Sequence, residues 1–275
     1  MIKTSRIPGP ANDCQLQNQM ISRTQAIVLR YYPIANTSRV VIWLTMDAGR
    51  ISTMIKGSLR PKSMFLGQYD QFYTCELLYY TRSTRQLHIA RECSPIKWRP
   101  ELRRNWKASA GASYFADLYF RLSPPGAHHA GLFILLEKTL DDLNVHGVLE
   151  PVIFWFELQL LSRLGLAPQL KQCLRCNREI ISGLMTALFS NELGGILCAS
   201  CANISAEQSA VIPPDVLNML LSWQSSDSAR ICRSTRCTAP QLASLDMILR
   251  KFIEFHLGIS PASRQLALNV LRRNP

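Results

Sequence analysis

Four cysteines arranged as two Cys-x-x-Cys pairs constrain this chain more than any other feature of its sequence. Cys173 and Cys176 form the first pair, and Cys198 and Cys201 form the second, with 21 residues between the pairs. Two residues between thiolates allow both sulfurs of one turn to bind the same ion, and two such turns supply a tetrahedral set of four sulfurs. The spacing slightly exceeds the usual ~15–20 residues, which a longer hairpin can accommodate. The pattern predicts one structural Zn²⁺ ion.

Other uses of these cysteines fit the sequence less well. Disulfides form in oxidising compartments, whereas the polar stretch Met1–Met20 lacks the ~7–15-residue apolar centre of a signal peptide. Two copies at this spacing argue against a redox Cys-x-x-Cys. Catalytic zinc usually keeps an open position with His or a carboxylate among its ligands, so four thiolates favour a structural role. We interpret the remaining cysteines as reduced thiols: Cys14, Cys75, Cys93, Cys232 and Cys237.

Positive charge is concentrated near the start of the chain. The net charge is +12 over 275 residues. Residues 1–110 contain 17 Lys and Arg and 6 Asp and Glu, whereas residues 111–275 contain 14 and 13. Clustered Lys and Arg attract polyanions, because their binding to phosphates releases condensed counterions. A uniform spread would have favoured a merely soluble basic protein, so the asymmetry favours a nucleic-acid ligand.

The apolar content is typical of a globular protein. Apolar residues make up 47% of the chain, which is too much for a disordered protein. No apolar run approaches the ~20 residues of a membrane span. We expect residues 1–22 to form a flexible extension, and the protein to be cytoplasmic with no membrane partner.

Residues 24–95 have the pattern of β-strands. Short runs rich in β-branched and aromatic residues alternate with turn-forming segments. We expect strands at Ala26–Tyr32, Val40–Thr45, Ile51–Lys56, Phe72–Tyr80 and Gln86–Cys93. Five short strands with no helix between most of them predict a small barrel or sandwich.

After Pro100 the apolar residues recur at helical spacing. We expect helices at Trp106–Leu122, Leu132–Leu143, Val152–Leu164, Pro213–Trp223 and Gln241–Leu257. Pro151 opens the third of these and Gly165 closes it. A helical region therefore follows the β region and flanks the cysteines on both sides.

Basic residues lie beside the strands and turns of the β region, and we predict that they contact DNA. The set is Arg30, Arg39, Arg50, Lys56, Arg60, Lys62, Arg82 and Arg85. The densest segment, residues 55–62, is a strand end followed by a basic loop with a glycine, which can follow a phosphate backbone. Alternatively, these basic residues are solvent-exposed charges that bind no ligand. Six aromatic residues offer possible stacking faces, although core packing is the simpler role for each: Tyr31, Tyr32, Trp43, Phe65, Tyr69 and Tyr73.

The usual catalytic motifs are missing from the sequence. It has no Gly-x-x-x-x-Gly-Lys-Ser/Thr phosphate loop, no Gly-x-Ser-x-Gly and no His-Glu-x-x-His. Asp141 and Asp142 are adjacent, so on a helix their side chains diverge by ~100° and form a poor metal site. We therefore expect a protein that is not an enzyme.

Several short segments occur in a characteristic order. The first are Ala26–Leu29, Val40–Thr45, Thr45-x-x-x-Gly49-Arg50 and Ile55-Lys56-Gly57-x-x-Arg60. The later ones are Phe156–Leu161, Gly165–Pro168 leading into Cys173-x-x-Cys176, Phe255–Gly258 and Ser263-Arg264. In this order and spacing they resemble the RecO family of bacterial recombination-mediator proteins, over roughly residues 24–272.

The resemblance implies an α+β multidomain fold. An OB-fold β-barrel that binds nucleic acid would span residues 23–98, after the extension at residues 1–22. An α-helical domain would span residues 99–170 and 203–275, and a zinc ribbon at residues 171–202 would be inserted into it. Some family members lack the cysteines, so zinc is expected to be structural and not part of the activity.

The resemblance also implies a role in DNA repair and recombination after DNA damage, in the RecFOR pathway. Such a protein binds single- and double-stranded DNA, anneals complementary strands and, with RecR, helps to load recombinase onto DNA coated by single-stranded DNA-binding protein (SSB). The acidic, hydrophobic-ended tail of SSB would dock on the helical domain, and it needs an apolar pocket with Arg or Lys at its rim. Arg121 is the candidate for that contact. A nucleoid-associated place in the bacterial cytoplasm follows from the same resemblance.

Two functions of other classes stay open. A zinc-ribbon OB-fold protein of translation or transcription would bind RNA, and preference for structured RNA over single-stranded DNA would identify it. A zinc enzyme of unknown type would lose turnover in the presence of a chelator, whereas structural zinc predicts only a loss of stability.

Overall fold

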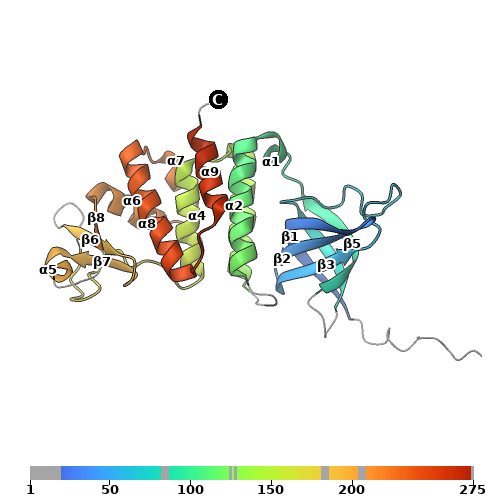
Figure 1. Cartoon of the computed structure of the whole chain (residues 1–275), viewed down its shortest axis with the longest axis horizontal. Helices are drawn as coiled ribbons and strands as arrows, with labels where there is room; N and C mark the ends of the chain where they lie inside the picture. Colours follow the sequence, from blue (N-terminus) through green and yellow to red (C-terminus); the bar gives the residue numbers. More distant parts are fainter. Residues whose placement is uncertain are drawn as a thin grey trace, which may run out of the picture.

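Three structural parts follow one another along the long axis of the molecule (Figure 1). The computed structural model describes residues 20–81, 87–123, 126, 129–180, 186–203 and 209–273. A β-barrel lies at one end, helices form the middle, and a small three-stranded sheet lies at the end farthest from the barrel. The expected α+β fold with an N-terminal barrel is therefore confirmed.

Five strands close the barrel in the order β1-β2-β3-β5-β4. They are β1 (Ile21–Ala35), β2 (Ser38–Thr45), β3 (Gly49–Ile55), β4 (Thr74–Tyr80) and β5 (Leu87–Lys97). β3 and β5 are parallel, and the other neighbouring pairs are antiparallel. β1 is longer than expected because its first half pairs with β4 and its second half with β2, with a bulge between Val28 and Arg30. The closed five-stranded barrel is OB-like.

Both faces of β1 over Ala26–Leu29 and of β2 over Val40–Thr45 are buried, which explains the nearly continuous apolar runs in these segments. Ala26 and Val28 pack with Trp43 in the core of the barrel. Ile27 and Leu29 belong instead to the larger core that the barrel shares with the helices. Because side chains alternate across a strand, the same two strands fill the barrel and attach it to the helical part.

Four helices follow the barrel: α1 (Glu101–Arg104), α2 (Trp106–Leu122), α3 (Ala130–His146) and α4 (Glu150–Arg163). α2 starts at a side-chain cap, where the Asn105 side chain accepts a hydrogen bond of 3.1 Å from the Ala108 N–H. α4 has Pro151 in its first turn and is buried continuously from Val152 to Leu161. A helix that is buried on all sides lies at the centre of a core, and α4 has this position.

Four more helices follow the small sheet: α6 (Pro214–Gln224), α7 (Arg230–Ser234), α8 (Ala239–Leu257) and α9 (Ala262–Arg272). α8 begins with a capping box formed by Thr238 and Gln241. α9 packs against α2, so the last helix lies beside the second one (Figure 1). The helical spacing predicted the five long helices other than α9 to within about three residues, but it did not indicate α1, α7 or α9.

The small sheet has the strand order β7-β6-β8. Its strands are β6 (Ala187–Ser190), β7 (Gly195–Cys198) and β8 (Ser209–Ile212), and α5 (Ala199–Ala202) follows β7. β8 pairs with β6, with Ile212 opposite Ala187, so the sheet continues beyond residue 202. A side chain on Gly195 would place its Cβ 2.3 Å from the Gln169 carbonyl oxygen, so this close backbone approach requires glycine.

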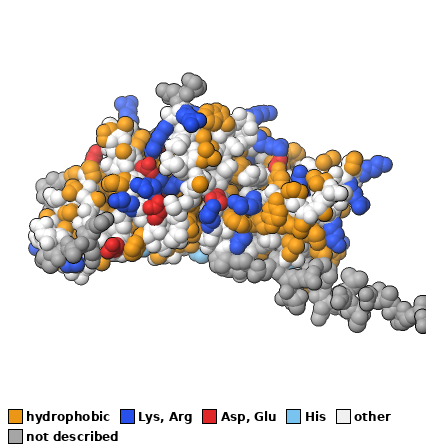
Figure 2. All heavy atoms as spheres, viewed as in Figure 1, with side chains coloured by type: hydrophobic (Ala, Val, Ile, Leu, Met, Phe, Trp, Pro, Cys, Tyr) orange, Lys and Arg blue, Asp and Glu red, His pale blue; other side chains and the backbone are white. Residues whose placement is uncertain are grey.

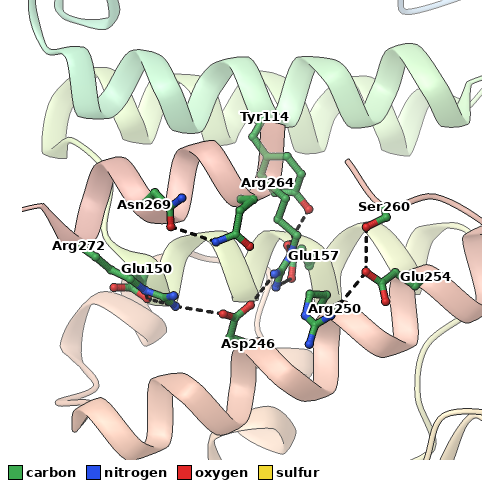
Figure 3. A network of polar contacts seen from close by, with 11 residues as sticks. Tyr114, Glu150, Glu157, Asp246, Arg250, Glu254, Ser260, Arg264, Asn269 and Arg272 are labelled. Carbon is green, nitrogen blue, oxygen red and sulfur yellow. Dashed lines mark hydrogen bonds and ion pairs between the residues drawn. The ribbon is translucent and has the colours of Figure 1, made fainter. Parts of the chain in front are cut away.

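A buried ion-pair network holds α9, α8 and α2 around α4 (Figure 3). Arg264 of α9 donates from Nε to Glu157 of α4 at 2.8 Å, and from Nη1 to Asp246 of α8 at 2.5 Å. The Tyr114 hydroxyl of α2 donates to Glu157 at 2.6 Å. Glu157 is 0% exposed and Arg264 is 3% exposed. Burial first, and then the nearby negative charge of Glu157, raise the pKa of Tyr114 well above its ordinary value, so its hydroxyl remains a donor.

Among the residues that the structure describes, no helix is both long and apolar enough to cross a membrane.

Removing the cation of this network should be costly. We expect Arg264→Leu to lower the free energy of unfolding by about 3–5 kcal/mol, because Glu157 would stay buried without a partner charge. Urea unfolding followed by circular dichroism measures the change. Arg250→Leu is the matched control, since Arg250 lies 3.8 Å from Glu254 in a half-exposed pair on α8 and such pairs contribute about 0–1 kcal/mol. Equal losses in the two variants would contradict the expectation.

Candidate nucleic-acid interface and metal centre

The sulfur atoms of the two Cys-x-x-Cys pairs converge beside the small sheet. The ligand atoms of Cys173, Cys176, Cys198 and Cys201 all lie within 4.8 Å of one another. The Sγ atoms of Cys176 and Cys198 are 3.8 Å apart. Four sulfurs placed ~2.3 Å from a central zinc would be separated by ~3.8 Å, whereas a disulfide needs ~2.05 Å. The spacing therefore fits a four-coordinate metal ion, and these four residues can hold one.

Two tight turns present these sulfurs. In the first, the Cys173 N–H donates to the Arg178 carbonyl at 2.8 Å, and the Asn177 N–H donates to the Cys173 carbonyl at 2.9 Å. Asn177 has a φ of 58°, in the left-handed region that asparagine tolerates better than most residues. In the second turn, Cys198 ends β7 and Cys201 lies in α5. Each pair of sulfurs thus comes from one reversal of the chain.

Backbone N–H groups favour negative charge on Cys173. The Cys198 N–H points to the Cys173 Sγ at a distance of 3.3 Å. Burial opposes ionisation of Cys173, but the N–H groups of Cys176, Cys198 and Arg175 outweigh burial and lower its pKa to about 6. The thiolate is the form that binds a metal ion. The Cys173 sulfur therefore favours the ionised form that binds a cation.

α8 connects the metal centre to the helical core. His256 Nε2 lies 2.7 Å from the Asn191 carbonyl oxygen, in the turn between β6 and β7. The rings of Phe189 in β6 and Phe252 in α8 are 5.9 Å apart. These two contacts attach the small sheet to α8, so a change in the folding of the sheet would also affect the packing of α8.

Four of the eight basic residues proposed to contact DNA lie together on the barrel: Arg39, Lys56, Arg60 and Lys62. Arg39 is opposite Ile55 in the pairing of β2 with β3. Lys56 is the residue after Ile55, so it lies next to Arg39. The chain then turns at Gly57, with a φ of 68°, and the Leu59 N–H donates to the Thr37 carbonyl at 3.1 Å. We call these four residues the basic loop surface.

The basic loop surface is open to solvent. Lys56, Arg60 and Lys62 are exposed, and Arg39 is half-buried. Lys and Arg side chains are visible at the barrel end of the molecule in Figure 2. This placement suits contacts with phosphates, which need accessible cations.

Arg30 and Arg50 have a different position, between the barrel and α2. Their guanidinium groups lie 3.9 and 5.0 Å from the centroid of the Phe120 ring. Arg30 donates to Asp117 at 3.1 Å, and Arg50 donates to the Ser123 carbonyl at 2.7 Å. Burial and then the charge of Arg30 lower the pKa of Arg50. These two arginines join the barrel to the helices, so they stay outside the basic loop surface. Arg82 and Arg85 lie outside the residues that the structure describes.

Two of the six candidate stacking residues remain accessible. Tyr32 is 47% exposed. Tyr31 is half-buried, and the Arg39 guanidinium lies 4.7 Å from the centroid of its ring. The other four belong to the barrel core: Trp43, Phe65, Tyr69 and Tyr73. Bases can therefore reach only the tyrosines of β1 in this set.

Arg121 borders a groove of about 760 Å³ between the barrel and the helices α2 and α9. The groove is lined by apolar groups such as Leu266, which is 63% exposed, and by Arg30 and Asp117. The Arg121 Nε donates to Asp117 at 2.9 Å, while its side chain stays 47% exposed. Two arginines and one carboxylate leave the groove lining with net positive charge.

Sequence patterns missed Arg99, which links the barrel to α3. Arg99 is 4% exposed and donates to the Phe72 carbonyl at 2.6 Å and to Asp141 at 2.6 Å. The neighbouring Asp142 pairs with Arg233 of α7 at 2.5 Å. The two adjacent carboxylates thus bind different arginines, as the divergence of neighbouring side chains on a helix requires. In the sequence, only the adjacent carboxylates Asp141 and Asp142 pointed to ion pairs in this region.

Comparison with known proteins agrees with this architecture. The family model "Recombination protein O N terminal" matches residues 20–99, and "Recombination protein O C terminal" matches residues 103–265. The chain is 29% identical over 245 residues to the DNA repair protein RecO of Desulforudis audaxviator, covering 88% of this chain and 94% of that protein. It is 27% identical over 239 residues to the DNA repair protein RecO of Dehalococcoides mccartyi, covering 87% and 92%.

The first family model covers the OB-like barrel, and the second covers the helices together with the four cysteines. The two models follow one another along this chain, and the two relatives match it over most of their own length. The chain therefore belongs to the recombination protein O (RecO) family of DNA repair proteins.

Proposed function

We propose that this protein binds single- and double-stranded DNA, anneals complementary strands and, with RecR, helps to load recombinase onto DNA coated by SSB. The observation that carries the proposal is the basic loop surface on an OB-like barrel, where three cations are exposed on one loop. Cations on such a barrel neutralise phosphates without reading the base sequence. That property suits a protein that must act on any damaged site.

Annealing itself requires no bond chemistry. Two complementary strands repel one another through their phosphates, and a protein that neutralises part of this charge lets them approach. We propose accordingly that the protein has no catalytic centre. Its place would be the bacterial cytoplasm, associated with the nucleoid through DNA.

Removing the charge of the basic loop should weaken binding to every DNA sequence. We expect a variant with Lys56, Arg60 and Lys62 changed to Ala to bind single-stranded DNA more weakly and to flatten the slope of log affinity against log salt by about 2, since each lost contact to a single strand removes ~0.7. Fluorescence anisotropy of a labelled oligonucleotide at several salt concentrations measures both quantities.

A matched control removes three exposed cations from the helical part. Arg230, Arg250 and Lys251 are exposed on α7 and α8, and their joint change to Ala alters the net charge equally. An equal effect of the two triple variants would show that only net charge matters, and an unchanged slope would place the DNA-binding face elsewhere. A stronger affinity for structured RNA than for single-stranded DNA would favour the RNA-binding alternative.

The four cysteines are proposed to hold one structural Zn²⁺ ion. When bound, zinc would cross-link the two turns and supply folding free energy to the small sheet. We expect Cys176→Ala to lower the thermal midpoint and to reduce the zinc content, while single-strand affinity changes little. Cys237→Ala, at a half-buried free cysteine, is the control and should keep the zinc. Equal melting of wild type and Cys176→Ala would contradict a structural metal.

The groove beside Arg121 is proposed to receive the acidic tail of SSB. Its apolar lining and net positive charge are the two properties that such a tail needs. We expect Arg121→Glu to weaken binding of a fluorescent tail peptide at least tenfold, because it reverses one charge at the rim. Binding of DNA at the basic loop should be unaffected.

Arg250→Glu is a discriminating control for the tail. Arg250 has a similar exposure, 45% against 47%, and a carboxylate partner four residues away, like Arg121. It also lines a second cavity, of about 380 Å³, with Leu242 and Met247. Loss of peptide binding in Arg250→Glu but not in Arg121→Glu would move the tail to that cavity. An annealing assay with and without RecR tests the remaining partner.

A further inference from the structure

Two of the five tryptophans of this chain are exposed at the junction of the barrel and the helices. Trp98 is 58% exposed and Trp106 is 54% exposed. The other three are between 0% and 2% exposed: Trp43, Trp155 and Trp223. Single exposed apolar side chains are common, and several gathered in one region are the ones that mark interaction sites; here two large rings flank the short helix α1 in the sequence.

Each ring has one defined neighbour in the structure. Trp98 stacks on Tyr73, with ring centroids 6.2 Å apart and an angle of 23° between the planes. One face of Trp98 is thus covered by protein while more than half of the side chain remains accessible. Trp106 is the first residue of α2, directly after the Asn105 cap that fixes the start of this helix. Trp98 thus follows directly after the end of β5, and Trp106 begins α2.

Three cations that are exposed or half-buried lie in the segment between and beside the two tryptophans in the sequence. Arg103 and Arg104 of α1 have side chains that are 61% and 75% exposed. The Lys107 Nζ lies 5.7 Å from the centroid of the Trp106 ring. Arg104 makes an exposed ion pair with Glu101, which contributes little, whereas Arg103 pairs with the largely buried carboxylate of Asp70 and keeps most of its own side chain exposed.

The junction is continuous with the basic loop surface. Asp70 accepts hydrogen bonds from the Tyr31 hydroxyl, at 3.0 Å, and from Arg103. Tyr31 in turn lies under the guanidinium of Arg39, a member of the basic loop surface. A chain of contacts thus runs from Arg39 through Tyr31 and Asp70 to Arg103, and the tryptophans lie on either side of that last residue in the sequence.

We propose that Trp98 and Trp106 form a stacking platform for the bases of single-stranded DNA. The inference rests on the proposed function, because the strand would reach the platform from the basic loop surface. Aromatic faces beside cations bind single strands of any sequence, since every base offers a π-face for stacking and every nucleotide a phosphate. In duplex DNA the base faces are covered by their neighbours, so the platform would favour the single strand.

Intrinsic fluorescence tests the platform directly, because the three other tryptophans are buried. Unlabelled oligothymidylate should quench the emission of the wild-type protein, and Trp98→Ala and Trp106→Ala should each remove part of the quenching and weaken affinity about five- to tenfold. Trp98→Phe and Trp106→Phe keep a ring, so they should lose the same share of quenching but bind nearly as well as wild type. Affinity is measured separately by anisotropy of a labelled strand.

The matched control is Phe255→Ala, at an aromatic residue of α8 that is 56% exposed, and it should bind like wild type. Thermal melts should show that the Trp variants are folded, and a folding defect in Trp98→Ala would leave the Phe variants and Trp106→Ala to decide. Binding of the oligonucleotide without quenching of tryptophan emission would overturn the proposed platform, but it would leave the proposed DNA contacts of the basic loop surface unaffected. Absence of any binding to DNA would overturn the proposed function as well. Unchanged DNA affinity in both Ala variants, with loss of a protein contact, would identify a protein-docking surface instead.

Discussion

The charge of Glu157 at the centre of the helical core is neutralised by one arginine, and much of the structure depends on that pairing. Glu157 lies in α4 and is fully buried, while Arg264 comes from α9, 107 residues later in the chain. A buried carboxylate without a partner would be strongly destabilising, so α9 must dock wherever α4 places this charge. α9 also packs on α2, and α2 carries the Phe120 ring between Arg30 and Arg50 of the barrel. The ion pair between Glu157 and Arg264 therefore positions α9, α9 packs against α2, and α2 holds the barrel.

Periodicity in the sequence was enough to predict the five strands of the barrel and the long helices other than α9, because these elements bury apolar faces, but it did not indicate the three short strands of the small sheet. It failed for α9, in which only three residues are buried and one of them is Arg264. A buried arginine looks like a surface arginine until its partner is known, and the partner is distant in the chain. The same limit applies to the basic residues of the β region. Local sequence cannot separate Lys56, which is exposed, from Arg50, whose guanidinium is engaged by Ser123 and Phe120.

The metal centre was the most predictable feature because both of its turns are local and its ligands are identical. The spacing of the cysteines predicted their convergence, and the structure brings all four sulfurs together. The metal centre and the basic loop surface lie in the parts at opposite ends of the long axis (Figure 1). The four cysteines and the exposed cations of the loop therefore belong to different parts of the molecule.

The double burial of β1 and β2 limits how this protein can change over evolutionary time. A polar substitution at Ala26 or Val28 would disturb the interior of the barrel, and one at Ile27 or Leu29 would disturb its attachment to the helices. Neither face of β1 over Ala26–Leu29 is free to acquire new ligand contacts, whereas Tyr31 and Tyr32 further along the strand remain accessible. Variation in what members of this lineage bind should therefore accumulate in the segments between strands and at the barrel–helix junction, where substitutions leave both cores intact.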